Sequence, residues 1–217
     1  LATGEIYILQ VRPLTANRKL QYFSDGDIEQ EIAAIKESVA TINDQSNLLL
    51  GRRSVLGVMP DWNPAEIIGR APRPLALTLY QYLIVDEVWG IQRAEYGYRN
   101  TYPTPLIVGL GGQGYVDVRA SFNSFIPFEV PEDLATHLVE SYINRLATMP
   151  HLHDKVEFEI AFTCLSFDFD SRSKRLSDNG FHSSEIEILK QSLLRLTRNA
   201  LINSPAFFEN QLSAVET

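Results

Sequence analysis

Apolar residues recur every three or four positions along much of the chain, which is the period of an amphipathic helix. The stretches with this pattern are residues 28–42, a short segment starting at 63, residues 75–96, residues 131–146 and residues 184–203. Helix-start signals mark several of them. Asp27 and Asn63 are suitable capping residues, and Ser184 with Glu187 has the spacing of a capping box. The pattern therefore predicts a mostly helical domain.

Shorter stretches alternate apolar and polar residues and predict strands. They are residues 5–12, 104–108, 115–119 and 155–162. Four glycines between Gly109 and Gly114 also match the spacing of a dinucleotide-binding loop. That loop has to lead into a helix, whereas here a predicted strand follows. We therefore expect a hairpin turn with glycines at positive φ, and an α+β fold with short antiparallel strands.

The long helical stretch over residues 75–96 has two different faces at about 100° per residue. One face is apolar and consists of Leu79, Leu83, Val88 and Ile91. The other mixes aromatic and charged residues, namely Tyr82, Asp86, Trp89 and Arg93. Two interpretations fit the mixed face: an interface to another element with an ion pair between Asp86 and Arg93, or a wall that contacts a ligand.

Polar residues gather where the predicted strand 115–119 ends. Because side chains alternate along a strand, we expect Asp117 and Arg119 on one face, opposite the core. Asn123 follows closely, and Arg99 lies just after the predicted long helix. The hypothesis is a substrate pocket for a small anion or polyol, lined by Arg99, Asp117, Arg119 and Asn123. The alternative is an ordinary solvated strand end with Arg99 in solvent.

Composition limits the class of partner. The chain has 19 basic and 27 acidic residues, a net charge of −8 and a pI near 5.0, which opposes binding to nucleic acid or to an anionic membrane. We expect neither partner. The single cysteine, Cys164, indicates a cytoplasmic protein, and its apolar neighbours predict a buried thiol. His151 and His153 have no evident third ligand, so we expect no metal site.

A family resemblance begins with the segment Tyr7-Ile-Leu-Gln-Val-Arg-Pro-Leu-Thr15. It resembles the strand that ends the ATP-grasp nucleotide-binding domain in the group of phosphoenolpyruvate synthase, pyruvate phosphate dikinase and rifampicin phosphotransferase. The resemblance implies that Gln10 and Arg12 approach the ATP phosphates and metal in a longer parent protein, and a guanidinium suits such contacts. It implies ATP and Mg²⁺ as cofactors of that parent and none for this truncated ATP-grasp remnant.

Further segments are similar to the acceptor-binding domain of rifampicin phosphotransferase-like proteins. The first is Asn63-Pro-Ala-Glu-Ile-Ile-Gly69, followed by the segment that starts at Pro74. The second is residues 114–118, with Asp117 where the family has asparagine. The resemblance implies two parts: a C-terminal remnant of the nucleotide-binding domain over residues 1–46, and a middle domain over residues 47–217.

These features predict a fragment of a multidomain, ATP-dependent phosphotransferase. Its part would bind the phosphoryl acceptor, a small molecule, or position a mobile phosphohistidine domain. No histidine here lies in the family's carrier motif, so the ATP-grasp domain and the carrier domain are expected elsewhere in the parent chain. This chain alone should then be inactive, with no catalytic residue. The alternatives are a noncatalytic scaffold or interdomain interaction module, and a stand-alone ligand-binding protein.

Overall fold

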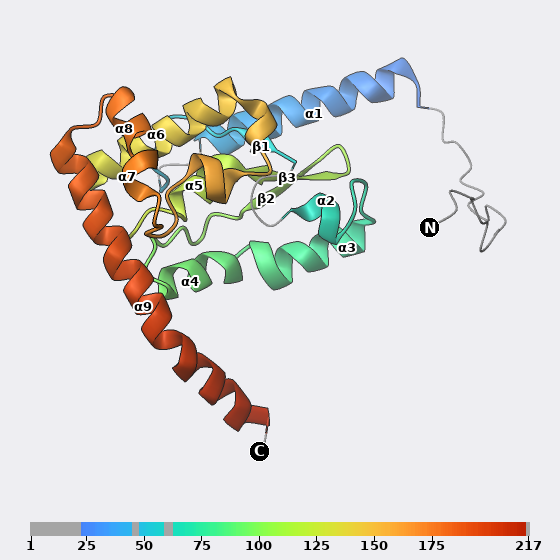
Figure 1. Cartoon of the computed structure of the whole chain (residues 1–217). Coiled ribbons are helices and arrows are strands. Elements are labelled where there is room, and N and C mark those ends of the chain that lie inside the picture. Colours follow the sequence, from blue (N-terminus) through green and yellow to red (C-terminus); the bar gives the residue numbers. More distant parts are fainter. Residues whose placement is uncertain (1–22, 45–47, 59–62, 216–217) are drawn as a thin grey trace, which may run out of the picture.

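A three-stranded antiparallel sheet with strand order β1-β3-β2 lies at the centre of the structure. The computed structural model describes residues 23–44, 48–58 and 63–215 (Figure 1). The strands are β1 (Leu56–Gly57), β2 (Ile107–Leu110) and β3 (Gln113–Asp117). With helices packed around this sheet, the predicted α+β class is confirmed. The predicted ATP-grasp strand over residues 5–12 and the domain boundary after residue 46 lie outside the described residues.

Helical segments form most of the remaining described chain (Figure 1). The α-helices are α1 (Asp25–Asp44), α2 (Pro64–Ile67), α3 (Pro74–Tyr80), α4 (Val88–Glu95), α5 (Val118–Asn123), α6 (Glu132–Thr148), α7 (Phe169–Arg172), α8 (Lys174–Asp178) and α9 (Ser183–Val215). The other helical segments are the π-helix η1 (Gln81–Val85), the 3₁₀ turn η2 (Pro150–Leu152) and the π-helix η3 (Val156–Ile160). No helix among the described residues combines the length and the apolar character that a membrane crossing requires.

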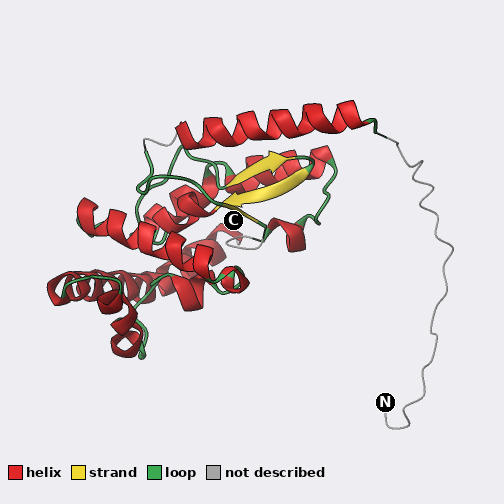
Figure 2. Ribbon diagram, turned by 90° about the horizontal axis from the view of Figure 1, so that it is seen from above, coloured by secondary structure: helices red, strands yellow, loops and turns green. Residues whose placement is uncertain are grey.

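The glycine-rich segment forms the expected hairpin. Leu110 pairs with Gln113, so the turn consists of Gly111 and Gly112, with φ angles of 56° and 75°. Positive φ at both central residues defines a type I′ turn, whose twist matches that of the two strands. Helix α1 runs beside this hairpin (Figure 2), where a Cβ atom at Gly111 would lie 3.5 Å from Ile35 Cδ1.

Two helix starts differ from the sequence prediction by a few residues. Ser24, not Asp27, caps α1: its Oγ accepts the Asp27 N–H at 3.2 Å, and Asp27 Oδ2 accepts the Ser24 N–H at 2.9 Å. Asp27 is thus the reciprocal partner in a capping box. At the start of α9, Glu185 Oε2 accepts the His182 N–H at 2.7 Å, two residues before the predicted box.

The stretch predicted as one helix over residues 75–96 consists of α3, η1 and α4, which together form a rod below the sheet in Figure 1. In η1 the Asp86 N–H donates to Gln81 O, five residues earlier, at 2.8 Å, which is the π-helical bond. The extra residue rotates α4 relative to α3. The predicted mixed face is consequently split, with Trp89 buried and Tyr82 exposed.

Two predicted strands are helical in part. The strand 115–119 ends at Asp117, and α5 begins at the next residue. The segment 155–162 contains the π-helix η3, in which Val156 and Ile160 are buried and Phe158 is exposed. The apolar residues at 156 and 160 are four positions apart, so a helical turn brings them to one side as well as an alternating strand does.

The core has two apolar clusters. The larger includes the predicted face of α6, and all four of its residues are buried: Leu134, Leu138, Tyr142 and Leu146. The smaller lies between the rod and the sheet and contains Tyr80, Val85 and Trp89. The clusters meet at α5, where Val118 belongs to the larger one and Ala120 to the smaller one.

Candidate functional site

Asp117 lies at the junction of β3 and α5 and is 3% exposed. Its Oδ1 caps α5 by accepting the backbone N–H groups of Arg119 and Ala120 at 2.9 and 3.1 Å. Ser54 Oγ donates to both carboxylate oxygens, at 3.0 and 2.8 Å. The expectation of an exposed strand face was therefore wrong. The signal that indicates this helix start is the strong preference of helix N-termini for aspartate.

Arg119 and Asn123 point toward the same chain segment as Asp117. Arg119 is 1% exposed, and its Nη1 donates to Gly51 O at 2.9 Å. Asn123 pairs with Leu50 in both directions, since its Nδ2 donates to Leu50 O at 3.0 Å and its Oδ1 accepts the Leu50 N–H at 2.9 Å. We call Asp117, Arg119 and Asn123, bound to residues 50–54, the clamp. Three of the four residues expected in a substrate pocket thus lie together, inside the protein.

Burial dominates the electrostatics of the clamp. It raises the pKa of Asp117, although the hydrogen bonds from Ser54 and Ala120 act in the opposite direction. Burial also lowers the pKa of the Arg119 guanidinium, against the attraction of Asp117 and Glu140. Charged groups in such a place need a counter-charge and hydrogen bonds, and the clamp supplies both. A ligand at these atoms would have to displace the backbone of residues 50–54.

Arg99, the fourth residue expected in the substrate pocket, lies outside the clamp. It is half-buried, and its backbone N–H donates to Ile126 O at 2.8 Å, beside a bridge between Tyr98 and Pro127. Ile126 follows the C-terminal end of α5, whereas Arg119 lies in the first turn of that helix. The backbones of the two arginines therefore lie near opposite ends of α5, and a ligand shared by their side chains stays a prediction. Gln10 and Arg12, the nucleotide-binding candidates, lie outside the described residues.

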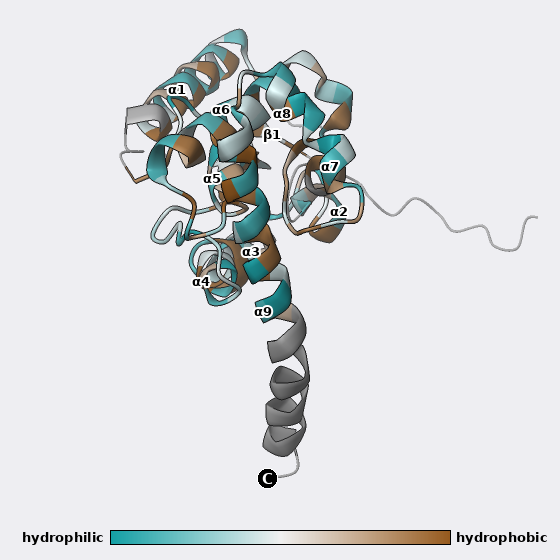
Figure 3. Cartoon of the chain, turned by 60° about the vertical axis from the view of Figure 1, so that its left-hand side comes forward, coloured by the Kyte–Doolittle hydropathy of each residue, from teal (hydrophilic) through white to brown (hydrophobic). Residues whose placement is uncertain are grey.

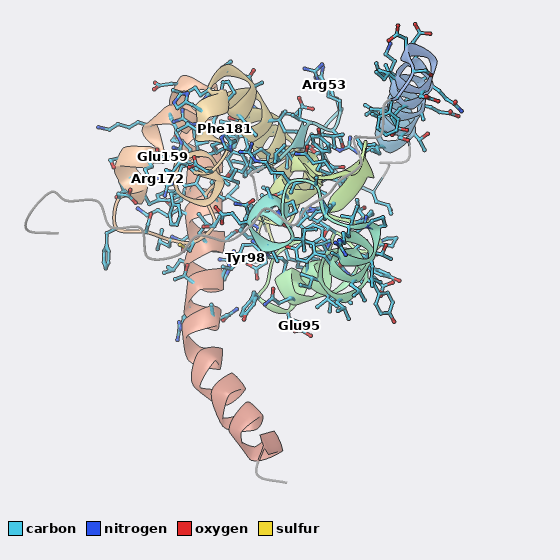
Figure 4. The ribbon with its side chains drawn as sticks, turned by 90° about the vertical axis from the view of Figure 1, so that its right-hand side faces the viewer. Arg53, Glu95, Tyr98, Glu159, Arg172 and Phe181 are labelled. Carbon is cyan, nitrogen blue, oxygen red and sulfur yellow. The ribbon has the colours of Figure 1, made fainter. Side chains whose placement is uncertain are left out.

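The structure contains an arginine cluster at the C-terminal end of η3 that the sequence analysis did not predict. Arg145 Nε and Arg175 Nη1 donate to Glu159 O at 3.1 and 2.7 Å. The guanidiniums of Arg172 and Arg175 lie 4.9 and 4.6 Å from the centroid of the Phe162 ring. Figure 4 labels Glu159 and Arg172 in this region of the molecule. The basic run from Arg172 to Arg175 is the sequence signal that could have indicated this cluster.

The cluster is bound mainly to the protein's own backbone. Carbonyl groups at the end of a helix carry partial negative charge, which attracts cations. Burial, and then the like charges of Arg172 and Arg145, lower the pKa of Arg175 to about 10. These arginines therefore hold the end of η3 in place and concentrate positive charge on an acidic protein.

The rod carries a row of exposed apolar side chains on the side that does not face the sheet. We call this row the rod face, and it consists of Leu75 (70% exposed), Leu79 (46%), Tyr82 (74%), Leu83 (58%), Val88 (53%) and Ile91 (44%). An apolar helix face normally packs against a core. Here other rod residues occupy the core side, so the rod is apolar on both sides. Figure 3 shows hydrophobic residues on α3 at the lower edge of the body.

The remaining chemical candidates lie in exposed positions. His151 and His153 are exposed near η2, and no group of three His, Cys, Asp or Glu side chains within the described ranges is placed to hold a metal ion. Cys164 is exposed, so the predicted burial of its thiol was wrong. The chain leaves the core after Phe162, and Thr163 O accepts a hydrogen bond from the Tyr98 hydroxyl at 2.6 Å.

Comparison of the chain with models of known protein families, with curated proteins and with solved structures gave no match. The resemblance to the phosphotransferase group therefore rests on the motifs over residues 7–15, 63–79 and 114–118 alone.

Proposed function

We propose that the chain is a noncatalytic interaction module of a multidomain phosphotransferase, and that it binds a partner protein surface through the rod face. The observation that carries this proposal is the row of six large apolar side chains, each at least 44% exposed. Contiguous apolar surface of this kind marks interaction sites on soluble proteins. The phosphotransferase context comes from the motif resemblance.

The energetics support a docking role. Full burial of one large apolar side chain stabilises a complex by roughly 1.5–3 kcal/mol. The six side chains are already partly buried, so covering what remains exposed contributes on the order of 5–10 kcal/mol in total. Association itself costs an estimated 4–15 kcal/mol, so the rod face suits a weak, reversible contact. Exposed charged residues lie at both ends of the row, namely Arg70, Arg73 and Glu95, and Glu87 is exposed within it, between Leu83 and Val88. The row is otherwise apolar with charged ends, and a polar rim around an apolar patch is the usual anatomy of a protein interface.

The local backbone is consistent with this role. Leu83 and Val88 are five positions apart, and the π-helical bonds of η1 span five residues. The π turn keeps both side chains on the exposed side while Val85 and Trp89 fill the core. π-helical turns are rare and occur frequently at functional sites. The irregular turn thus keeps apolar residues exposed.

A fluorescent label on the rod face tests the proposal. We would attach it at Tyr82→Cys in a Cys164→Ser background and measure quenching by acrylamide. The probes are the chain itself at rising concentration, and the separately produced nucleotide-binding and carrier portions of the parent. At least one probe should reduce quenching severalfold, while a control label at the exposed Asp133→Cys on α6 stays unchanged. Full quenching at position 82 with every probe would overturn the proposal.

Acceptor binding is a second candidate function, favoured by the gathering of Asp117, Arg119 and Asn123 in one cluster. In that case residues 50–54 move aside to admit an acceptor or its phosphoryl group. Inorganic phosphate is the simplest probe, and its addition should shift the amide NMR signals of Leu50 and Gly51. Unchanged signals at millimolar phosphate would contradict this role.

A further inference from the structure

We infer that the partner of the rod face is a second copy of this chain, bound antiparallel about a two-fold axis near Leu83. The inference rests on the proposed docking function of the rod face and names its partner. Three observations carry it: the spacing of the apolar residues, the charges at the two ends of the rod, and the exposed area.

Five of the six apolar residues of the rod face are arranged almost symmetrically about Leu83, and the sixth, Tyr82, has no exposed apolar counterpart. Leu75 lies eight positions before it and Ile91 eight positions after it, while Leu79 lies four before and Val88 five after. In an antiparallel pair related by a two-fold axis, Leu83 meets its own copy and Leu75 meets Ile91 of the other chain. Such an interface uses the same patch on both subunits, which is the commonest arrangement in homodimers.

The charges at the ends of the rod favour the antiparallel orientation. The N-terminal end carries the exposed Arg70 and Arg73, and the C-terminal end carries the exposed Glu95 (Figure 4). Antiparallel packing brings the basic end of one rod near the acidic end of the other. A parallel pair would place Arg73 beside its own copy, and like charges in an interface are unfavourable.

The exposed area is large enough for a dimer. From their exposed fractions, the six side chains of the rod face present on the order of 600 Å² per copy, so a pair would bury about 1,200 Å². Stable and specific interfaces begin at about this size. Because the area is at the lower limit of this class, we expect a weak, reversible dimer.

Sedimentation equilibrium of the full chain tests the inference. Between about 1 and 200 μM, the mass should rise from the 24.5 kDa of one chain toward twice that value. Leu83→Glu places two carboxylates at the axis and should weaken the dimer at least 100-fold. At about 1 μM, where the chain is mostly monomeric, the melting temperature should stay unchanged, because the side chain at 83 is 58% exposed. The matched control Leu194→Glu, at an exposed leucine of α9, should leave the dimer intact.

Cross-linking in a Cys164→Ser background tests the orientation. Leu83→Cys should form a disulfide-linked dimer on mild oxidation, because the axis brings position 83 against its own copy. Leu75→Cys alone should remain uncross-linked but should link efficiently to Ile91→Cys when the two proteins are mixed. Charge reversal adds a second readout: Arg73→Glu should weaken the dimer, and Glu95→Arg in the same chain should restore it.

The results of these experiments distinguish a failure of the homodimer from a failure of the proposed docking function. A chain that stays monomeric at 200 μM overturns the homodimer, and the label at position 82 then decides whether another part of the parent protein covers the rod face. A dimer that is insensitive to Leu83→Glu, or one in which Leu75→Cys links to itself, also overturns it. The docking function fails only if no probe shields the label.

Discussion

At the scale of single residues, Asp117 shows how one buried side chain joins distant parts of the chain. Its carboxylate caps α5 and also accepts the hydroxyl of Ser54, 63 positions earlier. Arg119 supplies a positive charge close by, and Asn123 holds Leu50. Removing one partner from such a network leaves buried polar groups unsatisfied, which costs more than the bond itself contributes. The clamp therefore has a clear structural role.

The raised pKa of Asp117 makes stability depend on pH. Because the folded pKa lies above the ordinary value of 3.8 for an aspartate, the native state binds this proton more tightly than the unfolded state. The contribution of Asp117 to the free energy of unfolding is then greatest below pH 3.8 and falls as pH rises through the folded pKa. The loss amounts to about 1.4 kcal/mol for each pH unit that separates the two pKa values.

We expect Asp117→Asn to remove this dependence. The quantity to measure is the free energy of unfolding of the wild type minus that of the variant, from urea titrations between pH 3 and 8. It should fall with rising pH, because the other titrating groups cancel in the difference. The control Asp154→Asn replaces an exposed carboxylate with a lowered pKa and should not produce such a fall. A difference that rises with pH would contradict the assigned direction.

At the scale of elements, the hairpin turn depends on two glycines at positive φ. Gly112 has a φ of 75° and no heavy atom within 4 Å of the position of an added Cβ atom. Gly112→Ala should therefore destabilise the protein by about 1–2 kcal/mol through backbone strain alone. Urea unfolding at neutral pH measures this loss.

Gly26→Ala is the matched control for the turn variant. Gly26 lies in α1, and its added Cβ would meet Ser24 Oγ at an ordinary 3.7 Å. Alanine favours a helix over glycine, so this variant should be neutral or slightly stabilising. If both variants lost the same stability, strain at the turn would not be the cause.

Helix α6 makes the main helical contribution to the larger cluster. Leu138 is fully buried there, and Leu138→Ala should cost about 2–5 kcal/mol by removing apolar contacts and leaving a cavity. Leu194→Ala, at a leucine of α9 that is 44% exposed, should cost less than about 1 kcal/mol. Chemical denaturation of both variants checks the difference. Equal losses would show that Leu138 is not in a packed core.

At the scale of the whole molecule, α5 links the two apolar clusters, and we expect them to unfold together. The Trp62→Phe variant retains Trp89, which lies in the smaller cluster, as the fluorescent reporter. Far-UV circular dichroism follows the helices. The two unfolding curves should coincide, and Leu138→Ala in the larger cluster should shift both midpoints equally. A tryptophan transition that Leu138→Ala leaves unmoved would show that the clusters unfold independently.

The sequence by itself determined the features that depend on neighbouring residues. The apolar face of α6 follows from spacings of three and four residues, and the type I′ turn follows from adjacent glycines. These are local preferences of the backbone and of amphipathic helices. The α+β class could be predicted for the same reason. The motif resemblance, which suggests a phosphotransferase, is also a property of the sequence alone.

Only the tertiary structure decided which polar and apolar residues are buried. Asp117 and Arg119 looked like exposed strand residues, but contacts to Ser54 and Gly51, 63 and 68 positions away, bury them at a helix start. Conversely, Leu79 and Leu83 are exposed although they form an apolar arc, because the core side of the rod is already filled. Burial depends on which distant segments pack together. Local periodicity indicates only which residues favour a buried position.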